Sequence, residues 1–460
     1  MSVRPHGSIS ARRFATRPRG VACLICVAGA ALLGTAHADP TVHITKGPYL
    51  QDLAPTSVEI RAELDAALPV SITLAARGAD AGPARTIRDS HASTMHVIHV
   101  DGLTPSTHYS YSLEAGPASA KGEFTTAPSN DSTEPFTFLV YGDNRSDETA
   151  HAAVVRQMMQ SPSDFIIHTG DFVQDGAVDD YWQTFFEIES PLVRDRCVYA
   201  CVGNHEIIDG AGANYLRFFG PVADAHGDGE KPKLYGSFRW GNARFFLLDA
   251  METFDDGPER VWLDDELSRS DAEKLAWRVV VLHHGPWSAG PHGGNRRMLR
   301  AGIPALFTAH HVDLILAGHD HIYERGFASG LPYVVSGGGG APLYPLDQPL
   351  PSTRKMESVH HFIEMSVSAN AIQLVAKRDD GSVLDRCGLA KATDQWDCDR
   401  APTVTAAAAQ SAPLPSSVTP APSKCACDVV GGDAGAPWSR WSLAAVALFA
   451  LAFVRRRRLQ

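Results

Sequence analysis

Five apolar segments between residues 136 and 317 each end in a short block of glycine and residue types that bind metal ions. The blocks are Gly142-Asp143-Asn144-Arg145, Gly170-Asp171-Phe172, Gly203-Asn204-His205-Glu206, His283-His284-Gly285-Pro286 and Gly318-His319-Asp320-His321. Strand-like segments alternate with helical patterns from about residue 135, which predicts an α/β domain. Since such folds place ligands at the carboxyl ends of their strands, we expect the blocks to meet at one sheet edge. Their carboxylates, carboxamide and imidazoles suit a pair of divalent or trivalent ions.

Each block is a weak signal by itself, because a lone Gly-Asp is usually a turn and a lone His-x-His is usually a surface loop. Five blocks in this order resemble the calcineurin-like metallophosphoesterases, and within them the purple acid phosphatase branch. The stretch Gly318–Arg325 is close to the branch's Gly-His-x-His-x-Tyr-Glu-Arg, and Gly203–Glu206 matches its third block. The resemblance covers roughly residues 41 to 390. It implies an α/β metallophosphoesterase domain, placed at residues 128–398, with two mixed sheets flanked by helices.

The resemblance also implies a site for two metal ions, with Fe, Zn and Mn as candidates. The implied ligands are Asp143, Asp171, Gln174, Asn204, His283 or His284, His319 and His321. Asp171 would bridge the two ions. Asp143 and His321 would hold the first ion, and Asn204 and His319 would hold the second together with one of the tandem histidines. Of these two, His284 is favoured because the run from His284 to Trp287 keeps the family's spacing between this ligand and an x-Pro-aromatic sequence.

Two histidines and one arginine are candidate catalytic residues. His205 matches a family histidine that contacts phosphate and donates a proton, and His292 lies where the branch carries another histidine. Arg145 stands where the wider superfamily often has histidine, and Gln174 stands where the branch has a metal-binding tyrosine. Without that tyrosine the protein should not be purple. Arg145 cannot bind a metal ion, so we expect the first of the two ions to be bound weakly. Arg145 can instead clamp a phosphate oxygen.

These residues predict an exported, binuclear, metal-dependent phosphatase that hydrolyses phosphomonoesters through attack by a metal-bound hydroxide. One alternative is a phosphodiesterase or nucleotidase with the same site. Another is a surface binding module in which Arg145 and Gln174 have disabled the metal site.

Charge narrows the class of partner. Outside residues 1–38 and 437–460 the chain has 31 basic against 52 acidic residues, a formal net charge of −21. This charge repels polyanions, so nucleic acid is excluded as a partner and a small phosphoester fits best.

The two ends of the chain predict export. Residues 1–38 read as a signal peptide, with five arginines, an apolar stretch and a small-x-small cleavage site. Residues 399–436 form a Pro/Ala/Ser/Thr-rich linker, and residues 437–460 carry an apolar run followed by Arg455–Arg458. This tail resembles a myxobacterial sorting tag that is removed, or it is a C-terminal membrane anchor. We expect no contact with a membrane other than through this tail. We expect the protein at the cell surface or outer membrane, in the periplasm or secreted.

Residues 39–127 predict a separate all-β sandwich, because short alternating segments are separated by turn residues. Leu103–Tyr111 resembles the tyrosine corner of fibronectin type III domains. We expect this domain to be structural or cleft-shaping, with carbohydrate binding or adhesion as the alternative. Cys387 and Cys398 are expected to form a disulfide, whereas Cys197 and Cys201 lie too far apart along one strand.

Overall fold

The computed structural model describes residues 41–78, 82–208, 212–220, 234–251, 254, 257–391 and 395–399. The predicted signal peptide, nearly all of the predicted linker and the C-terminal tail lie outside these residues. Among the described residues, no helix has both the length and the apolar character needed to cross a membrane.

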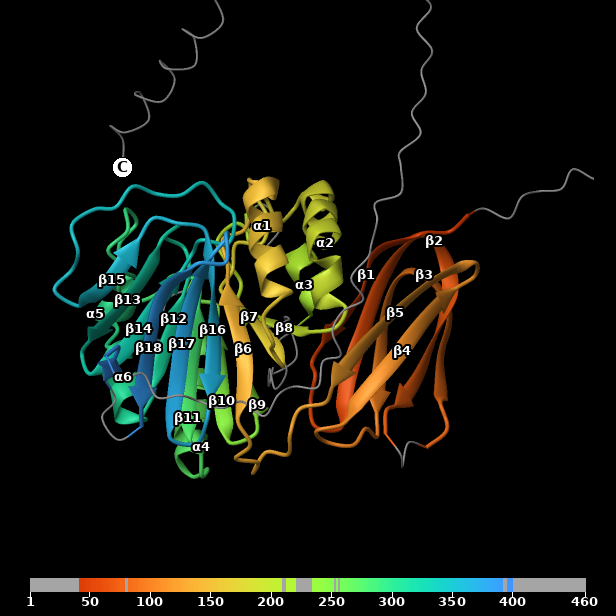
Figure 1. Ribbon diagram of the computed structural model, residues 1–460, viewed down its shortest axis with the longest axis horizontal. Helices are drawn as coiled ribbons and strands as arrows, with labels where there is room; N and C mark the ends of the chain where they lie inside the picture. Colours follow the sequence, from red (N-terminus) through yellow and green to blue (C-terminus); the bar gives the residue numbers. More distant parts are fainter. Residues whose placement is uncertain are drawn as a thin grey trace, which may run out of the picture. The chain divides into compact units, whose positions relative to one another are not determined.

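The N-terminal region is all-β, as predicted, and forms a five-stranded sheet (Figure 1). Its strands are β1 (Ile44–Gln51), β2 (Ser57–Ala76), β3 (Arg85–Asp101), β4 (His108–Ala115) and β5 (Ala118–Thr125). The long strand β2 pairs with β1 in its first half, with β4 in its second half and with β3 along both. The hydroxyl of Tyr109 accepts a hydrogen bond from the Thr104 N–H (3.0 Å), so this tyrosine ties the preceding loop to its own strand. The sandwich arrangement and the fibronectin type III resemblance stay predictions.

The rest of the described chain contains two mixed, seven-stranded sheets. Sheet I has the order β19-β18-β17-β16-β6-β7-β8, with β6 (Phe136–Tyr141), β7 (Phe165–His168), β8 (Cys197–Ala200), β16 (His361–Val367), β17 (Ala371–Arg378), β18 (Val383–Ala390) and β19 (Trp396–Asp397). Sheet II has the order β15-β13-β14-β12-β11-β10-β9, with β9 (Gly236–Trp240), β10 (Ala243–Leu248), β11 (Trp277–Leu282), β12 (Leu314–Ala317), β13 (Tyr323–Ala328), β14 (Leu331–Ser336) and β15 (Thr353–Glu357). Two mixed sheets agree with the predicted fold class.

Residues on β6 alternate between two cores because successive side chains of a strand point to opposite faces. Phe138 and Val140 lie in the core between the sheets, where Phe138 packs edge-on against Phe245 of sheet II with ring centroids 5.4 Å apart. Leu139 and Tyr141 belong instead to the core beneath the helices. Sheet I is therefore buried on both faces at β6, as expected for its largely apolar sequence.

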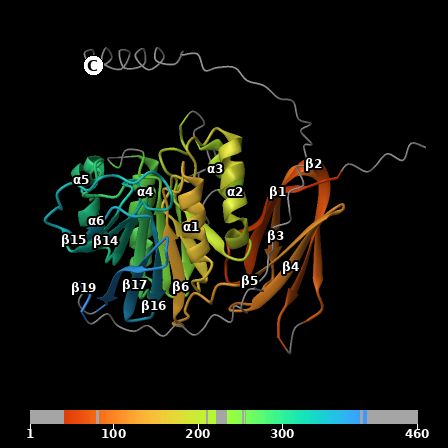
Figure 2. The same ribbon diagram turned by 45° about the horizontal axis from the view of Figure 1, so that its top comes forward.

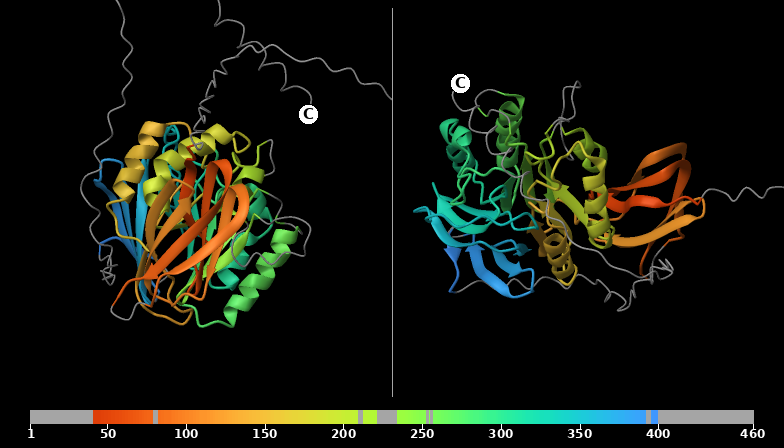
Figure 3. Two further views of the ribbon diagram at one scale, coloured as in Figure 1. Left: turned by 90° about the vertical axis from the view of Figure 1, so that its right-hand side faces the viewer. Right: turned by 90° about the horizontal axis from the view of Figure 1, so that it is seen from above.

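Helices cover the outer face of each sheet (Figures 2 and 3). On sheet I these are α1 (Glu148–Met158), α2 (Asp179–Val193) and α3 (Ala213–Phe219), and on sheet II they are α4 (Pro258–Asp271), α5 (Arg296–Arg300) and α6 (Ile303–Ala309). The side chain of Asp147 caps α1 by accepting from the Thr149 and Ala150 N–H groups. A helix thus begins directly after the first block and holds its loop against sheet I.

Strand direction decides where the blocks gather. In sheet I, β6, β7 and β8 are parallel, and in sheet II, β10, β11, β12 and β14 are parallel. The blocks follow β6, β7, β8, β11 and β12, which are all members of these parallel groups. The predicted Cys387–Cys398 disulfide is present away from the blocks, and Cys197 and Cys201 are buried free thiols, as expected.

Candidate metal centre

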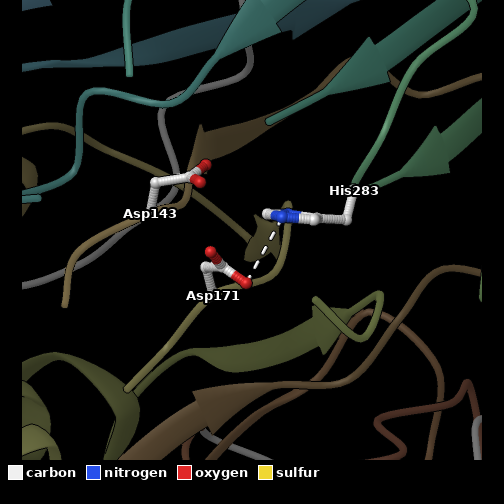
Figure 4. Close-up of side chains that lie close together, drawn as sticks. All are labelled: Asp143, Asp171 and His283. Atoms are coloured by element: carbon white, nitrogen blue, oxygen red, sulfur yellow. Dashed lines mark ion pairs between the residues drawn. The ribbon is translucent and has the colours of Figure 1, made fainter. Parts of the chain in front are cut away.

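Three side chains from three different blocks converge on one point (Figure 4). Asp143 follows β6, Asp171 follows β7 and His283 follows β11, and one ligand atom from each lies within 4.8 Å of the other two. All three side chains are buried. Two carboxylates and an imidazole with no exposed surface are expensive to bury without a cation, so this cluster is the centre of the candidate site.

The backbone at the centre takes a conformation that is rare for residues with a side chain. Asp143 has φ 56°, Asp171 has φ 58° and His319 has φ 73°, all in the left-handed region. Glycine is needed beside them for space, because a Cβ at Gly318 would lie 2.4 Å from Asp143 Oδ2. Such strain persists only where its surroundings hold it, and it concentrates at functional sites.

Glu206, the last residue of the third block, organises this backbone, a role that the sequence did not predict. Its carboxylate is buried and accepts hydrogen bonds from the N–H groups of Gly203, Asp171 and Phe172, each at 2.9 Å. Burial, and then the charge of Asp171, raise the pKa of Glu206 to about 8, while hydrogen bonds from the N–H groups of Gly203, Asp171 and Val173 oppose the shift. Glu206 therefore joins the loops after β7 and β8. In the sequence, only its place as an acidic residue inside a block could have indicated this role.

Four potential ligand atoms define what we call the second position. His283 Nε2 lies 3.1 Å from Asn204 Oδ1, 3.2 Å from His319 Nδ1 and 3.3 Å from Asp171 Oδ1. His283 Nδ1–H donates to the carbonyl of Thr169 (2.8 Å), which leaves the lone pair of Nε2 facing the other three atoms. The donor set fits a borderline divalent ion such as zinc, because imidazoles and a carboxylate suit such ions.

The preference for His284 over His283 is not supported by this geometry. His284 Nε2 bonds to the carbonyl of Gly293 at 3.0 Å, and the His284 ring lies against His319 with centroids 4.4 Å apart. Adjacent side chains at a strand end point in opposite directions, and the register of β11 directs His283 inward. Spacing to the following proline and tryptophan could not reveal which of two neighbours faces the centre.

Charge states at the centre favour ligand behaviour. Burial lowers the pKa of His283, and burial followed by the neighbouring histidines lowers that of His319. Burial also lowers the pKa of His321 to about 4, so these imidazoles are neutral at pH 7. For Asp171, burial acts in the opposite sense, but His283 and His205 outweigh it and lower the pKa. Burial and the nearby Asp171 raise the pKa of Asp143 well above its usual value.

The residues predicted for the first ion surround a second point, which we call the first position. It is bounded by Asp143, Asp171, Gln174 and His321, and His321 Nε2 lies 3.7 Å from Asp143 Oδ1. Arg145 extends into this position: its Nε lies 3.2 Å from Asp171 Oδ2, and its Nη1 lies 2.9 Å from Gln174 Oε1. The first position therefore presents a cation among the atoms expected to hold one, and these residues do not fit a metal ion as they stand.

The candidate proton donors lie at the rim. The His205 N–H donates to Asp171 Oδ1 (3.1 Å), and its Nε2 lies 3.7 Å from Asp171 Oδ2. His292 is exposed, and its ring lies 4.6 Å from that of His319. Its Nε2 is 3.1 Å from the hydroxyl of Tyr344, a residue that sequence reasoning missed because it follows the last block by more than twenty positions. The ring of Tyr344 also stacks on that of His321 with centroids 4.1 Å apart, so Tyr344 contacts both His292 and the first-position residue His321.

A cavity of about 840 Å³ opens beside the second position. Asn204, His284, His292 and His319 line its inner end, and α5 lines its outer end with Arg296, Arg297 and Arg300. Among the residues that the structure describes, no aspartate or glutamate lines this cavity. It is therefore a basic recess within a chain whose formal net charge is −11.

The chain is similar in sequence to known proteins. Residues 136–323 match the family described as calcineurin-like phosphoesterase. The chain is 25% identical over 273 residues to the phosphoenolpyruvate phosphatase of Allium cepa, covering 56% of each chain. It is 28% identical over 240 residues to the probable purple acid phosphatase 20 of Arabidopsis thaliana, covering 50% of this chain and 54% of that one. The chain thus spans little more than half the length of these relatives.

The fold is also similar to a solved structure. The purple acid phosphatase isolated from yellow lupin (Lupinus luteus) seeds superposes with a TM-score of 0.65 at 16% sequence identity. The match covers 78% of this chain and 77% of that chain. At this identity the likeness concerns the fold.

Proposed function

We propose, from the premise that residues 136–323 form a calcineurin-like metallophosphoesterase domain, that the chain is a metal-dependent phosphatase of small phosphomonoesters. One observation carries the proposal: Asp171, Asn204, His283 and His319 direct four potential ligand atoms at the second position. The order and spacing of the blocks support the same reading, as do phosphatase relatives that each match about half of the chain. Of the metals expected from the sequence, Fe, Zn and Mn all accept this donor set.

A divalent ion held at this position by Asp171, Asn204, His283 and His319 would neutralise charge on a phosphoryl oxygen and acidify a water molecule. The chain's own residues supply the rest. Asp171 orients the loop of His205 by accepting its N–H, and His205 Nε2 remains at the rim of the centre. From there His205 donates a proton to the leaving oxygen, and His292, with its ring beside His319, is the second candidate donor.

Reconstitution tests the function directly. The purified protein, stripped by chelator and reloaded with Mn, Zn or Fe, should hydrolyse p-nitrophenyl phosphate faster than bis(p-nitrophenyl) phosphate. Chelator should abolish turnover, and metal should restore it. No turnover of either ester by protein shown to contain metal would refute the proposal and favour the surface binding module with a degenerate site.

The basic cavity favours a second candidate within the same chemistry, a nucleotidase or phosphodiesterase. Arg296, Arg297 and Arg300 are exposed and form no ion pair with another described residue, in contrast to Arg260 and Arg278 on the same face of sheet II. Free guanidinium groups beside a phosphatase centre suit a leaving group that carries a further anion.

A matched pair of substrates tests this candidate. Adenosine 3′,5′-bisphosphate should be hydrolysed with a higher kcat/KM than adenosine 5′-monophosphate, because only the former carries a second phosphate for α5. Replacing all three arginines with glutamine should abolish that preference and leave p-nitrophenyl phosphate turnover unchanged. Equal kcat/KM for the two nucleotides in the wild-type protein would exclude the candidate.

Export belongs to the proposal as well. The apolar and arginine-rich features of residues 1–38 and the Cys387–Cys398 disulfide both suit an oxidising compartment. Location at the surface or outer membrane, in the periplasm or in the medium would follow from fractionating cells that produce the full chain.

A further inference from the structure

We infer that the guanidinium of Arg145 takes the place of the first metal ion, so that the centre holds a single ion, at the second position. The inference rests on the proposed function and changes one part of it, the number of ions. It is carried by the placement of Arg145 among the atoms expected to bind the first ion.

Each arm of the Arg145 guanidinium contacts a different one of these atoms. Nε lies 3.2 Å from Asp171 Oδ2, Nη1 lies 2.9 Å from Gln174 Oε1 and Nη2 lies 3.4 Å from His321 Nε2. Asp171 and Gln174 lie in the loop after β7, and His321 lies in the loop after β12. Because the three contacts join two loops, they are a convergent set rather than one surface ion pair.

The acceptors are in the states that this arrangement needs. His321 Nδ1–H donates to the carbonyl of Pro342 (2.7 Å), so its Nε2 carries the lone pair that Arg145 faces. Gln174 offers its Oε1 to Arg145 and also to the hydroxyl of Ser146. Asp171, Gln174 and His321 thus direct lone pairs that a metal ion would require at guanidinium N–H groups. The oxygens of Asp143 instead accept from the His319 N–H.

A guanidinium cannot coordinate a metal, because it has donors and no lone pair, and it stays charged at any working pH. A second ion would have to displace Arg145 from a nearly enclosed place, since the side chain is only 12% exposed. Asp171 then bridges unlike cations: Oδ1 faces the second position, and Oδ2 faces Arg145. The centre then keeps two cations: one metal ion and the guanidinium of Arg145, which carries a single positive charge and belongs to the chain itself.

This arrangement gives Arg145 a task. Its planar fork suits phosphoryl oxygens, so a phosphate bound to an ion at the second position has a fixed cation on its other side. Arg145 is therefore expected to lower the KM for phosphomonoesters as well as to exclude an ion.

Counting ions tests the inference. The full chain, stripped and reloaded with manganese, is measured by native mass spectrometry and by electron paramagnetic resonance. We expect one Mn²⁺ per chain and the spectrum of an isolated ion. Arg145→His, which places an imidazole where the wider superfamily often has one, should bind two ions and show a spin-coupled pair. Arg156→His, an exposed arginine of α1, is the matched control and should bind one.

The outcomes separate the inference from the function on which it rests. Two ions in the wild-type protein, with phosphatase activity intact, would overturn the inference and leave the proposed function standing. A single ion in folded Arg145→His would also overturn it, because the guanidinium would then not be what excludes the first ion. No ion in any of the three proteins would instead refute the proposed function.

Discussion

The first and second positions lie side by side and share Asp171, yet they present opposite surfaces to a cation. At the second position, His283, Asn204 and His319 leave lone pairs facing one point. At the first, the lone pairs of Asp171 and His321 already face Arg145. One carboxylate can therefore organise a metal site on one side and an ion pair on the other.

The difference arises from the loop after β6. Asp143 is held by the N–H of His319, which donates to both carboxylate oxygens, so its loop is bound to the last block. Two residues later the same loop carries Arg145, whose side chain occupies the first position between residues of the other loops. The two-ion architecture thus depends on one side chain more than on the fold.

Removing the shared carboxylate should have the largest effect. Asp171→Asn keeps the size of the side chain but removes the charge that faces both positions, so we expect kcat for p-nitrophenyl phosphate to fall by about 10³-fold or more, and metal to be lost. Steady-state kinetics and metal analysis measure both. Asp180→Asn, an exposed residue of α2, is the control, and wild-type turnover by Asp171→Asn would contradict the shared role.

Substituting the tandem histidines one at a time tests the second position alone. His283→Ala should weaken metal binding by about 100-fold or more, since Nε2 faces the ligand set. His284→Ala should weaken it by less than about 10-fold, because that ring packs against His319 and its Nε2 bonds to the Gly293 carbonyl rather than facing the ligand set. Titration with Mn²⁺ followed by calorimetry ranks the two variants, and the reverse order would restore the sequence-based preference for His284.

Removing the candidate proton donor His205 should affect catalysis without changing the ligand atoms of either position. His205→Ala should lower kcat by about 10²-fold, because proton donation to the leaving oxygen is lost. The number of bound ions should not change, since none of the four atoms facing the second position belongs to His205. A parallel loss of metal would show that His205 acts as a ligand.

The last prediction concerns stability rather than activity, at a buried histidine outside both positions that serves as a baseline. His361 is buried beside Tyr323, and burial, with a smaller contribution from His360, lowers its pKa to about 4. The unfolded chain binds this proton near the ordinary value of 6.5, so the unfolded state holds more protons between pH 6.5 and 4. The contribution of His361 to stability is therefore present above pH 6.5 and is lost as pH falls to about 4, by up to about 3 kcal/mol.

Urea unfolding at several pH values measures this slope. His361→Gln should have a shallower loss of stability in acid than the wild-type protein, and His360→Gln should not. An unchanged slope in His361→Gln would assign the acid sensitivity to the site histidines. A glycine makes room for the buried ring, because a Cβ at Gly338 would lie 2.3 Å from His361 Nδ1.

Several site residues were predictable because their signal is local. Asp143 and Asp171 directly follow strand ends, and the parallel order of β6 and β7 brings such residues together whatever packs around them. Glu206 and Tyr344 were not predictable in their roles. Glu206 acts through the backbone of another loop, and Tyr344 comes near His292 only because the chain returns past the site after β14.

The sequence by itself determined the α/β domain, the all-β region before it, the Cys387–Cys398 pairing and the residue types gathered at the strand ends. These follow from periodicity and from order along the chain, which are local properties. Only the tertiary structure decided that His283 rather than His284 faces Asn204, and that Arg145 enters the first position. Both depend on the direction in which a side chain leaves its strand end, and neighbouring loops that are distant in sequence set that direction.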